Sequence, residues 1–144
     1  MRNTNIVASF LLLMRGDKIL LHKRCNSGYH DGEYSLIAGH VEAGETFTST
    51  IIREAKEEAG ITLKPGNLTV VHVMHHKSDV DASERVNVYF LARKWEGEIT
   101  NGEPEKCEEL EWFDVHNLPP NIIDAVRKVI NNVLKKIPYS EYGW

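Results

Sequence analysis

The segment that most constrains this chain is Gly39–Ile61, which reads GHVEAGETFTSTIIREAKEEAGI. It contains five glutamates but only two Lys or Arg residues. Residues 46–59 include no proline or glycine, and Gly60 follows at the position where a glycine in the left-handed conformation commonly ends a helix. The segment therefore predicts a helix over residues 46–59 whose acidic side chains need a counter-charge.

The glutamates near the end of this helix are expected on one side of it. Each residue of an α-helix advances by about 100°, so Glu54, Glu57 and Glu58 fall within an arc of about 100°. Like charges at these spacings repel by a few tenths of a kcal/mol per pair. The neighbouring arc is small and aliphatic, which predicts that it packs against a sheet; it contains Ile52, Ala55 and Ala59.

A hard divalent cation would remove this repulsion. Mg²⁺ takes oxygen ligands and commonly binds through a few carboxylates together with the phosphates of a substrate. The alternative is a solvated helical face, as on most charge-rich helices. The charge pattern alone leaves both interpretations open.

The order of residues in the segment resembles the signature of the Nudix hydrolases. That signature is a glycine, five residues, a glutamate, seven residues, Arg-Glu, an aliphatic residue, one residue, Glu-Glu, one residue, a glycine and an aliphatic residue. One departure lies just before it, where this chain has Ile37-Ala38 and the family often has Pro-Gly. The matching positions are Gly39, Glu45, Arg53, Glu54, Ala55, Glu57, Glu58, Gly60 and Ile61.

The resemblance implies a metal-dependent enzyme with a Nudix-like α/β/α sandwich and a mixed sheet. Glu54, Glu57 and Glu58 would hold Mg²⁺ or Mn²⁺, with the carbonyl group of Gly39 as a further ligand. Many members of the family supply another carboxylate from outside the signature, and Glu108 in the sequence CEELEW is the favoured candidate.

The catalytic residues implied by the resemblance are Glu54, Glu57, Arg53 and Glu45. Glu54 is also a candidate general base, although the family does not use one base uniformly. The guanidinium of Arg53 is expected to pair with Glu45 and so hold the preceding loop against the helix. The reaction would be hydrolysis of a nucleoside diphosphate linked to another group, with a nucleoside triphosphate or a modified nucleotide favoured as substrate.

The rest of the chain predicts a sheet and a second helix within a single domain, residues 1–144. Two apolar runs around Gly16-Asp17 predict a β-hairpin, and apolar residues at helical spacing predict a helix over residues 121–137. The aromatic tail, residues 139–144, is expected to fold back onto the body of the protein. Further strands are expected at residues 34–37, 68–74, 85–92 and 110–113.

Composition limits the partners. The net charge of −4 argues against a broad surface for a nucleic-acid polymer, and no apolar run is long enough to span a membrane. We therefore expect a cytoplasmic protein that acts on a small nucleotide, and oligomeric state is left open. Two other functions stay possible from the sequence: a nucleotide-binding sensor of the same fold without catalysis, and a protein–protein interaction module.

Overall fold

The computed structural model describes residues 1–144 and contains two helices and eight strands. Helix α1 comprises Phe47–Ala59 and helix α2 comprises Asp124–Leu134, and a short 3-10 turn covers Pro65–Asn67. The strands are β1 (Ile6–Arg15), β2 (Lys18–Arg24), β3 (Tyr34–Ser35), β4 (Ile37–His40), β5 (Thr69–Lys77), β6 (Glu84–Ala92), β7 (Cys107–Asp114) and β8 (Tyr139–Tyr142).

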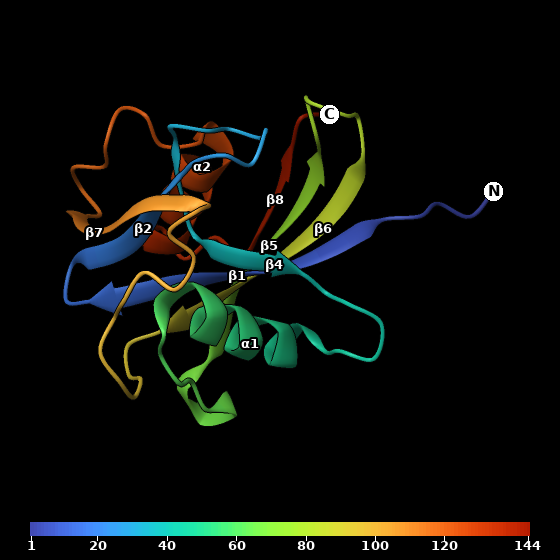
Figure 1. The fold of residues 1–144 in the computed structure, drawn as a ribbon. Helices are drawn as coiled ribbons and strands as arrows, with labels where there is room; N and C mark the ends of the chain where they lie inside the picture. Colours follow the sequence, from blue (N-terminus) through green and yellow to red (C-terminus); the bar gives the residue numbers. More distant parts are fainter.

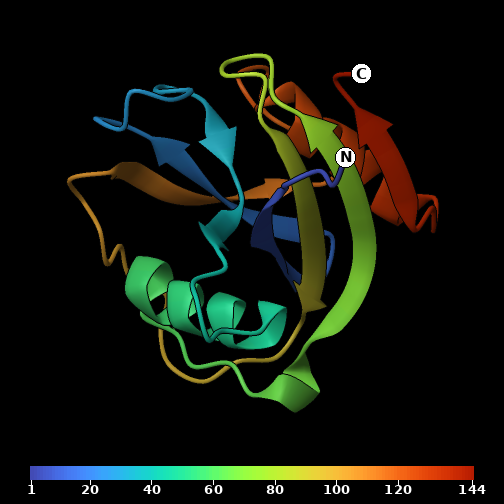
Figure 2. The same cartoon turned by 90° about the vertical axis from the view of Figure 1, so that its right-hand side faces the viewer.

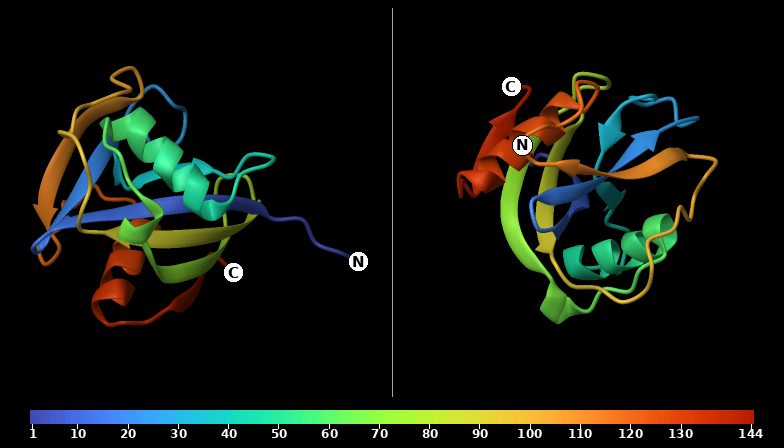
Figure 3. Two further views of the ribbon diagram at one scale, coloured as in Figure 1. Left: turned by 90° about the horizontal axis from the view of Figure 1, so that it is seen from below. Right: turned by 90° about the vertical axis from the view of Figure 1, so that its left-hand side faces the viewer.

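The strands form one mixed sheet in the order β3-β2-β1-β6-β5-β8, with β4 paired to β1 and β7 paired to β2. The pairs β1–β6 and β5–β8 are parallel, and the others are antiparallel. Helix α1 packs against β1 and β4 (Figure 1), and α2 packs against β5. Figure 3 shows the two helices on opposite sides of β1, so the expected sandwich of helices around a mixed sheet is present.

Strand β1 is apolar on both faces because each face contributes to a different core. Leu11 and Leu13 belong to the core under α1, and Leu12 and Met14 belong to the core under α2. Alternate residues of a strand point to opposite sides of the sheet, which explains this division. The sheet is therefore buried on both sides along its central strand.

The N-terminal hairpin is confirmed, with Met14 opposite Ile19 at the end of β1 and the start of β2. The expected single strand at residues 34–37 is wrong in detail, because the chain divides there into β3 and β4. Strand β3 pairs with β2, whereas β4 pairs with β1, so the chain changes partner between Ser35 and Ile37. This change of partner places β4 in contact with α1.

Helix α2 is shorter than the predicted helix over residues 121–137. Its first expected turn is extended instead, because Asn121 O accepts a hydrogen bond from Tyr34 N and Ile123 N donates one to Tyr34 O. At the other end, Lys136 has a φ of 59°, which is incompatible with a continuing α-helix. Tertiary hydrogen bonds to β3 thus override the helical pattern at its start.

The C-terminal tail folds back, as expected, and forms strand β8 beside β5 at the edge of the sheet (Figure 2). Trp144 Nε1 donates a hydrogen bond of 3.0 Å to the carbonyl oxygen of His75, and the hydroxyl of Tyr142 donates one of 2.6 Å to Asp124 in α2. The tail thus links the sheet to α2. No helix is long and apolar enough to cross a membrane.

Candidate active site

Helix α1 starts and ends where its sequence specifies. The side chain of Thr46 accepts a hydrogen bond from Ser49 N, and Ser49 Oγ accepts one from Thr46 N, which forms a reciprocal cap. Gly60 ends the helix with a φ of 70°, and its N–H donates to Lys56 O. Ser9 Oγ donates a 2.7 Å hydrogen bond to Phe47 O and so fixes the start of the helix to β1.

The packing face of α1 differs slightly from the prediction. Ala55 and Ala59 are buried as expected, but Ile51 is the fully buried isoleucine and Ile52 is only half-buried. The buried face is therefore rotated toward Ile51. The acidic side chains of this helix lie away from that face and next to β4.

Arg53 holds the loop before α1 against the helix. Its Nε and Nη2 donate hydrogen bonds of 2.8 and 3.0 Å to the two carboxylate oxygens of Glu45, which is a bidentate pair. Glu45 Oε1 also accepts hydrogen bonds from Glu42 N and from Thr50 Oγ1. The hydrogen bonds from Arg53 lower the pKa of Glu45 to about 2, so this carboxylate is ionised throughout the neutral range.

We expect Arg53→Lys to reduce turnover by about tenfold or more, because groups that orient metal ligands typically contribute 10–100-fold. A lysine keeps the positive charge but cannot make the bidentate contact with Glu45. Measurement of kcat on a nucleotide substrate would test this, with Arg93→Lys at an exposed position as the matched control. Unchanged kcat in Arg53→Lys would contradict a positioning role for the bidentate pair.

Glu54 and Glu58 form the most strongly perturbed pair of acidic groups. Burial of its carboxylate and the nearby charge of Glu54 raise the pKa of Glu58 well above its usual value, even though Glu58 accepts a 3.2 Å hydrogen bond from Ala38 N. Burial also raises the pKa of Glu54, and this effect is opposed by Glu58 and Arg53. Both carboxylates would gain from a nearby cation beyond the one that Arg53 supplies.

The only strong cation at this face is Arg53 itself. Its Nη1 lies 2.6 Å from Glu54 Oε1 and 3.4 Å from Glu57 Oε2. No three acidic, His or Cys side chains therefore converge on one point in this arrangement.

Gly39 lies directly against Glu54. A Cβ atom at residue 39 would overlap the Glu54 carboxyl group, so any larger residue at this point of β4 would displace that side chain. The same strand supplies Ala38 N to Glu58. Strand β4 therefore positions two of the acidic groups of α1.

We expect Gly39→Ala to displace the Glu54 carboxylate and to reduce turnover by about tenfold or more, as loss of support for a metal ligand does. Because the displaced group is the end of a flexible side chain, the thermal midpoint should change little. Gly66→Ala is the matched control, since a Cβ atom there meets no other atom. Full activity of Gly39→Ala in a steady-state assay would contradict this assignment.

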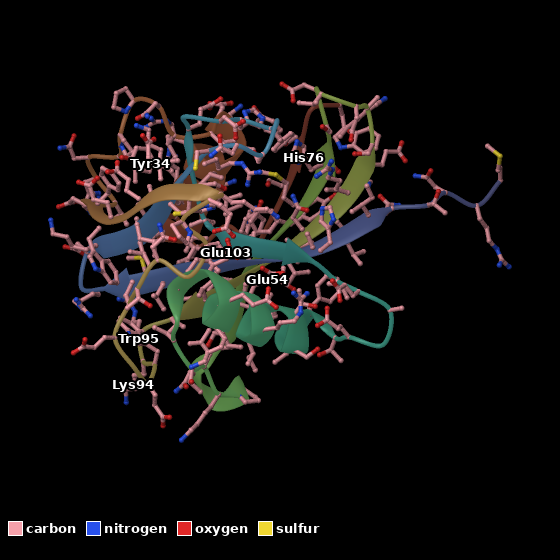
Figure 4. The ribbon with its side chains drawn as sticks, viewed as in Figure 1. Tyr34, Glu54, His76, Lys94, Trp95 and Glu103 are labelled. Carbon is pink, nitrogen blue, oxygen red and sulfur yellow. The ribbon has the colours of Figure 1, made fainter.

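A carboxylate that the sequence did not single out, Glu103, lies near this pair. The segment before β7 passes the end of α1, where Gly102 N donates a 3.1 Å hydrogen bond to Glu58 O. The charge of Glu103 contributes to the raised pKa of Glu58. Figure 4 shows Glu103 and Glu54 in the same region of the molecule. Gly102 permits this approach, since a Cβ atom at residue 102 would overlap Glu57 O.

Glu108 lies elsewhere on this surface. Its carboxylate forms an ion pair of 3.2 Å with Lys23 Nζ, and its side chain is 57% exposed. The neighbouring Glu109 accepts a hydrogen bond from the hydroxyl of Tyr34, on the other side of β7. The structure thus brings Glu54, Glu57 and Glu58 together on one face of α1 but pairs Glu108 with a lysine.

A pocket of about 340 Å³ opens on the far side of Gly39 from the acidic face. Its walls are mainly apolar, and its polar groups include Arg24, Arg85 and Asn87. The rings of Phe10 and Tyr89 stack within it, with their centroids 4.6 Å apart. The remaining lining residues are Ala8, Tyr29, Ser35, Ala38, Gly39, His40, His76, Ile123, Ala125 and Val126.

One family of known proteins matches this chain both in sequence and in fold. The model of the NUDIX domain matches residues 4–133 of this chain. The chain belongs to the Nudix family. The MutT NUDIX hydrolase from Burkholderia pseudomallei has a crystal structure similar to this one, with a TM-score of 0.81 and 29% sequence identity over 90% of this chain and 98% of that chain. The expected Nudix fold is therefore confirmed.

Two proteins with sequences similar to this chain have names that state an activity. The ADP-ribose pyrophosphatase of Methanocaldococcus jannaschii is 33% identical over 127 residues, which cover 86% of this chain and 70% of that protein. The NAD-capped RNA hydrolase NudC of Stutzerimonas stutzeri is 31% identical over 109 residues, 76% of this chain but only 36% of that protein. The expectation of a Nudix-type pyrophosphohydrolase that acts on phosphoric anhydride bonds is confirmed.

Proposed function

We propose that this Nudix protein hydrolyses, with Mg²⁺ or Mn²⁺, the anhydride bond of a nucleoside diphosphate linked to another group. The observation that carries the proposal is the position of Gly39, which lines the pocket on one side and contacts Glu54 on the other. A substrate whose nucleoside occupies the pocket can pass its diphosphate over this residue, where no side chain obstructs it. The diphosphate then meets the acidic face of α1.

The donor set at that face suits a hard divalent cation. Glu54, Glu57 and Glu58 would hold it together with the carbonyl group of Gly39, because carboxylate and carbonyl oxygens are the ligands that Mg²⁺ prefers. For the carboxylate from outside the signature we favour Glu103 over Glu108, since Glu103 acts on Glu58 whereas Glu108 pairs with Lys23. When bound, the cation neutralises phosphate charge and makes a bound water more acidic.

The side chains of the protein have separate parts in this reaction. Arg53 and Glu45 keep the loop before α1 in place, so that Gly39 stays against Glu54. Glu54 accepts the proton of the water that attacks phosphorus, and its side chain is only 14% exposed, which limits competing bulk water. Glu57 is the most solvent-accessible of the three helical carboxylates and is therefore the one most open to an entering diphosphate.

For the substrate, we favour a nucleoside triphosphate or a modified nucleotide. A pocket of about 340 Å³ is of a size to enclose one nucleoside and not two. ADP-ribose is a second candidate because of the 33% identity to an ADP-ribose pyrophosphatase. We place the partner among small nucleotides, and NAD-capped RNA belongs in the test because of the NudC relatives.

The test is incubation of the purified protein, with and without Mg²⁺, with nucleoside triphosphates, ADP-ribose, NAD and NAD-capped RNA. Chromatography of the products should reveal a nucleoside monophosphate from at least one substrate, and only when the metal is added. Binding without turnover would support the catalytically silent sensor instead. Neither binding nor turnover would overturn both proposals and favour an interaction module.

A further inference from the structure

A second pocket lies on the α2 side of the sheet, further along β1 than the first. Its volume is about 460 Å³, and it shares no lining residue with the pocket beside Gly39. Ala8 and Phe10 of β1 line the first pocket, whereas Leu12 and Met14 line the second. The second pocket is therefore separate from the candidate active site. Its other lining residues are Val71, Leu91, Arg93, Val115, Ile130, Val133, Leu134 and Lys136.

A β-bulge in β5 gives this pocket an apolar wall at the edge of the sheet. The register between β5 and β6 shifts between Val70 and His72, so Val71 is an extra residue in β5. Neighbouring residues of a regular strand point to opposite faces. Here Val71 packs against the core under α2, and the ring of the adjacent His72 also lies on that side, 5.9 Å from the ring of Tyr89. The bulge thus keeps Val71 available to line the pocket.

The polar groups of the lining are two cations, and no Asp or Glu accompanies them. Arg93 and Lys136 are both exposed, and neither forms an ion pair with an acidic side chain. Arg93 Nη1 donates a 3.2 Å hydrogen bond to Gly16 O, which leaves its other N–H groups without a partner in the protein. Two unpaired cations beside an apolar pocket suit a ligand with an apolar body and an anionic group.

Lys136 also occupies a backbone position that glycine usually takes. Its φ is 59°, its N–H donates to Val133 O, and the N–H of Ile137 donates to Asn132 O, which is a Schellman motif at the end of α2. A side chain in the left-handed conformation costs free energy that a glycine would avoid. The chain nevertheless has a lysine here, and its side chain lines the second pocket. A strained residue at a pocket is an indication of function.

We propose that the second pocket binds a medium-chain carboxylate, with its alkyl chain between α2 and the sheet and its carboxylate at Arg93 and Lys136. The chain would cover apolar surface that includes Leu134, whose exposed fraction is 43%. Each CH₂ group that it buries should raise affinity about fourfold. Because Lys136 lies at the C-terminal end of α2, where the helix dipole disfavours anions, a singly charged carboxylate is favoured over a phosphate. This site is additional to the one that hydrolyses anhydrides and does not rest on it.

The proposal is tested by isothermal titration at pH 8, which does not depend on turnover. Decanoate, octanoate and 1-octanol would be compared below the concentrations at which they form micelles. Decanoate should bind about tenfold more tightly than octanoate, since it has two further CH₂ groups. Octanoate should bind about fivefold more tightly than 1-octanol, which lacks the charge. Equal affinity for octanoate and 1-octanol, or binding of neither, would overturn the proposal.

Variants of the two cations locate the binding. Lys136→Gln and Arg93→Gln should each weaken octanoate binding about twofold or more, whereas Lys135→Gln makes the same change at an adjacent exposed residue outside the lining and should bind as the wild type. Lys136→Gly should also bind octanoate more weakly, and its thermal midpoint should equal or exceed that of the wild type because glycine adopts this φ without strain.

Two further outcomes would overturn the proposal. One is octanoate affinity that is unchanged in both Lys136→Gln and Arg93→Gln, because the carboxylate would then not lie at these cations. The other is a concentration-dependent dimer, measured by analytical ultracentrifugation, that excludes octanoate. In that case a second copy of the chain would cover the pocket.

Discussion

Replacement of Glu57 by glutamine should reduce kcat/KM by about a hundredfold or more, since it removes a negative charge that we propose holds the metal ion, and the metal ion in turn neutralises the phosphate of the substrate. Glu57 is suited to this test because its side chain is 49% exposed and its carboxylate contacts the protein through a 3.4 Å ion pair with Arg53 Nη1. Glutamine has nearly the same size and a neutral amide. The fold should therefore be retained while the negative charge of the side chain is lost.

The measurement is a steady-state assay of Glu57→Gln over a range of Mg²⁺ concentrations, with circular dichroism as the check on folding. Glu98→Gln makes the same change at an exposed glutamate outside the acidic face and should behave as the wild type. The apparent affinity for Mg²⁺ should fall together with the rate. Wild-type activity of Glu57→Gln at limiting Mg²⁺ would refute its assignment as a metal ligand.

Glu58→Gln should raise the thermal stability of the metal-free protein and lower its activity in the presence of Mg²⁺. Burial and the charge of Glu54 raise the pKa of Glu58, so an ionised Glu58 is costly in the metal-free protein. In the presence of a chelator at pH 8, the variant should therefore have a thermal midpoint higher by at least about 3 °C, given that ~1 kcal/mol shifts the midpoint of a domain of this size by a few degrees. With Mg²⁺, the variant should be nearly inactive, because it would lack one of the proposed metal ligands.

The difference in thermal midpoint between Glu58→Gln and the wild type should depend on pH, and its sign follows from the raised pKa of Glu58. A glutamate in the unfolded chain has a pKa of about 4.3, and that of folded Glu58 is higher. The stability contributed by the neutral group is fully present below the unfolded value and is lost as pH rises through the folded value. The gap in midpoint between Glu58→Gln and the wild type in chelator should thus widen from pH 5 to pH 8.

Added Mg²⁺ provides the complementary measurement. It should raise the midpoint of the wild type at pH 8, because the cation stabilises the ionised pair of Glu54 and Glu58, and it should raise that of Glu58→Gln much less. Glu98→Gln should follow the wild type in both conditions. A midpoint for Glu58→Gln below that of the wild type in chelator would show that ionised Glu58 stabilises the metal-free protein.

The acidic site could be predicted from the sequence because its parts are local. Helix α1 is specified by its cap at Thr46 and its stop at Gly60, and helical geometry then places Glu54, Glu57 and Glu58 on one side. The pair of Arg53 with Glu45 also follows from a short separation along the chain. No distant segment is needed for any of these features.

The features that sequence reasoning missed depend on contacts between distant segments. Glu103 comes near Glu58 only because Gly102 allows the backbone to touch the end of α1. The start of α2 is displaced by hydrogen bonds from Tyr34. Periodicity within one segment carries no information on such contacts.

The parallel pairing of β1 with β6 has a consequence for biosynthesis. β1 is synthesised before residues 85–92, with which it pairs, and the whole of α1 is made between them. Contacts between parts so distant along the chain tend to form late and slowly. In a nascent chain that ends before β6, one edge of the apolar strand β1 has no partner strand. Such an exposed edge favours aggregation, so we expect chaperones to bind the chain at this stage.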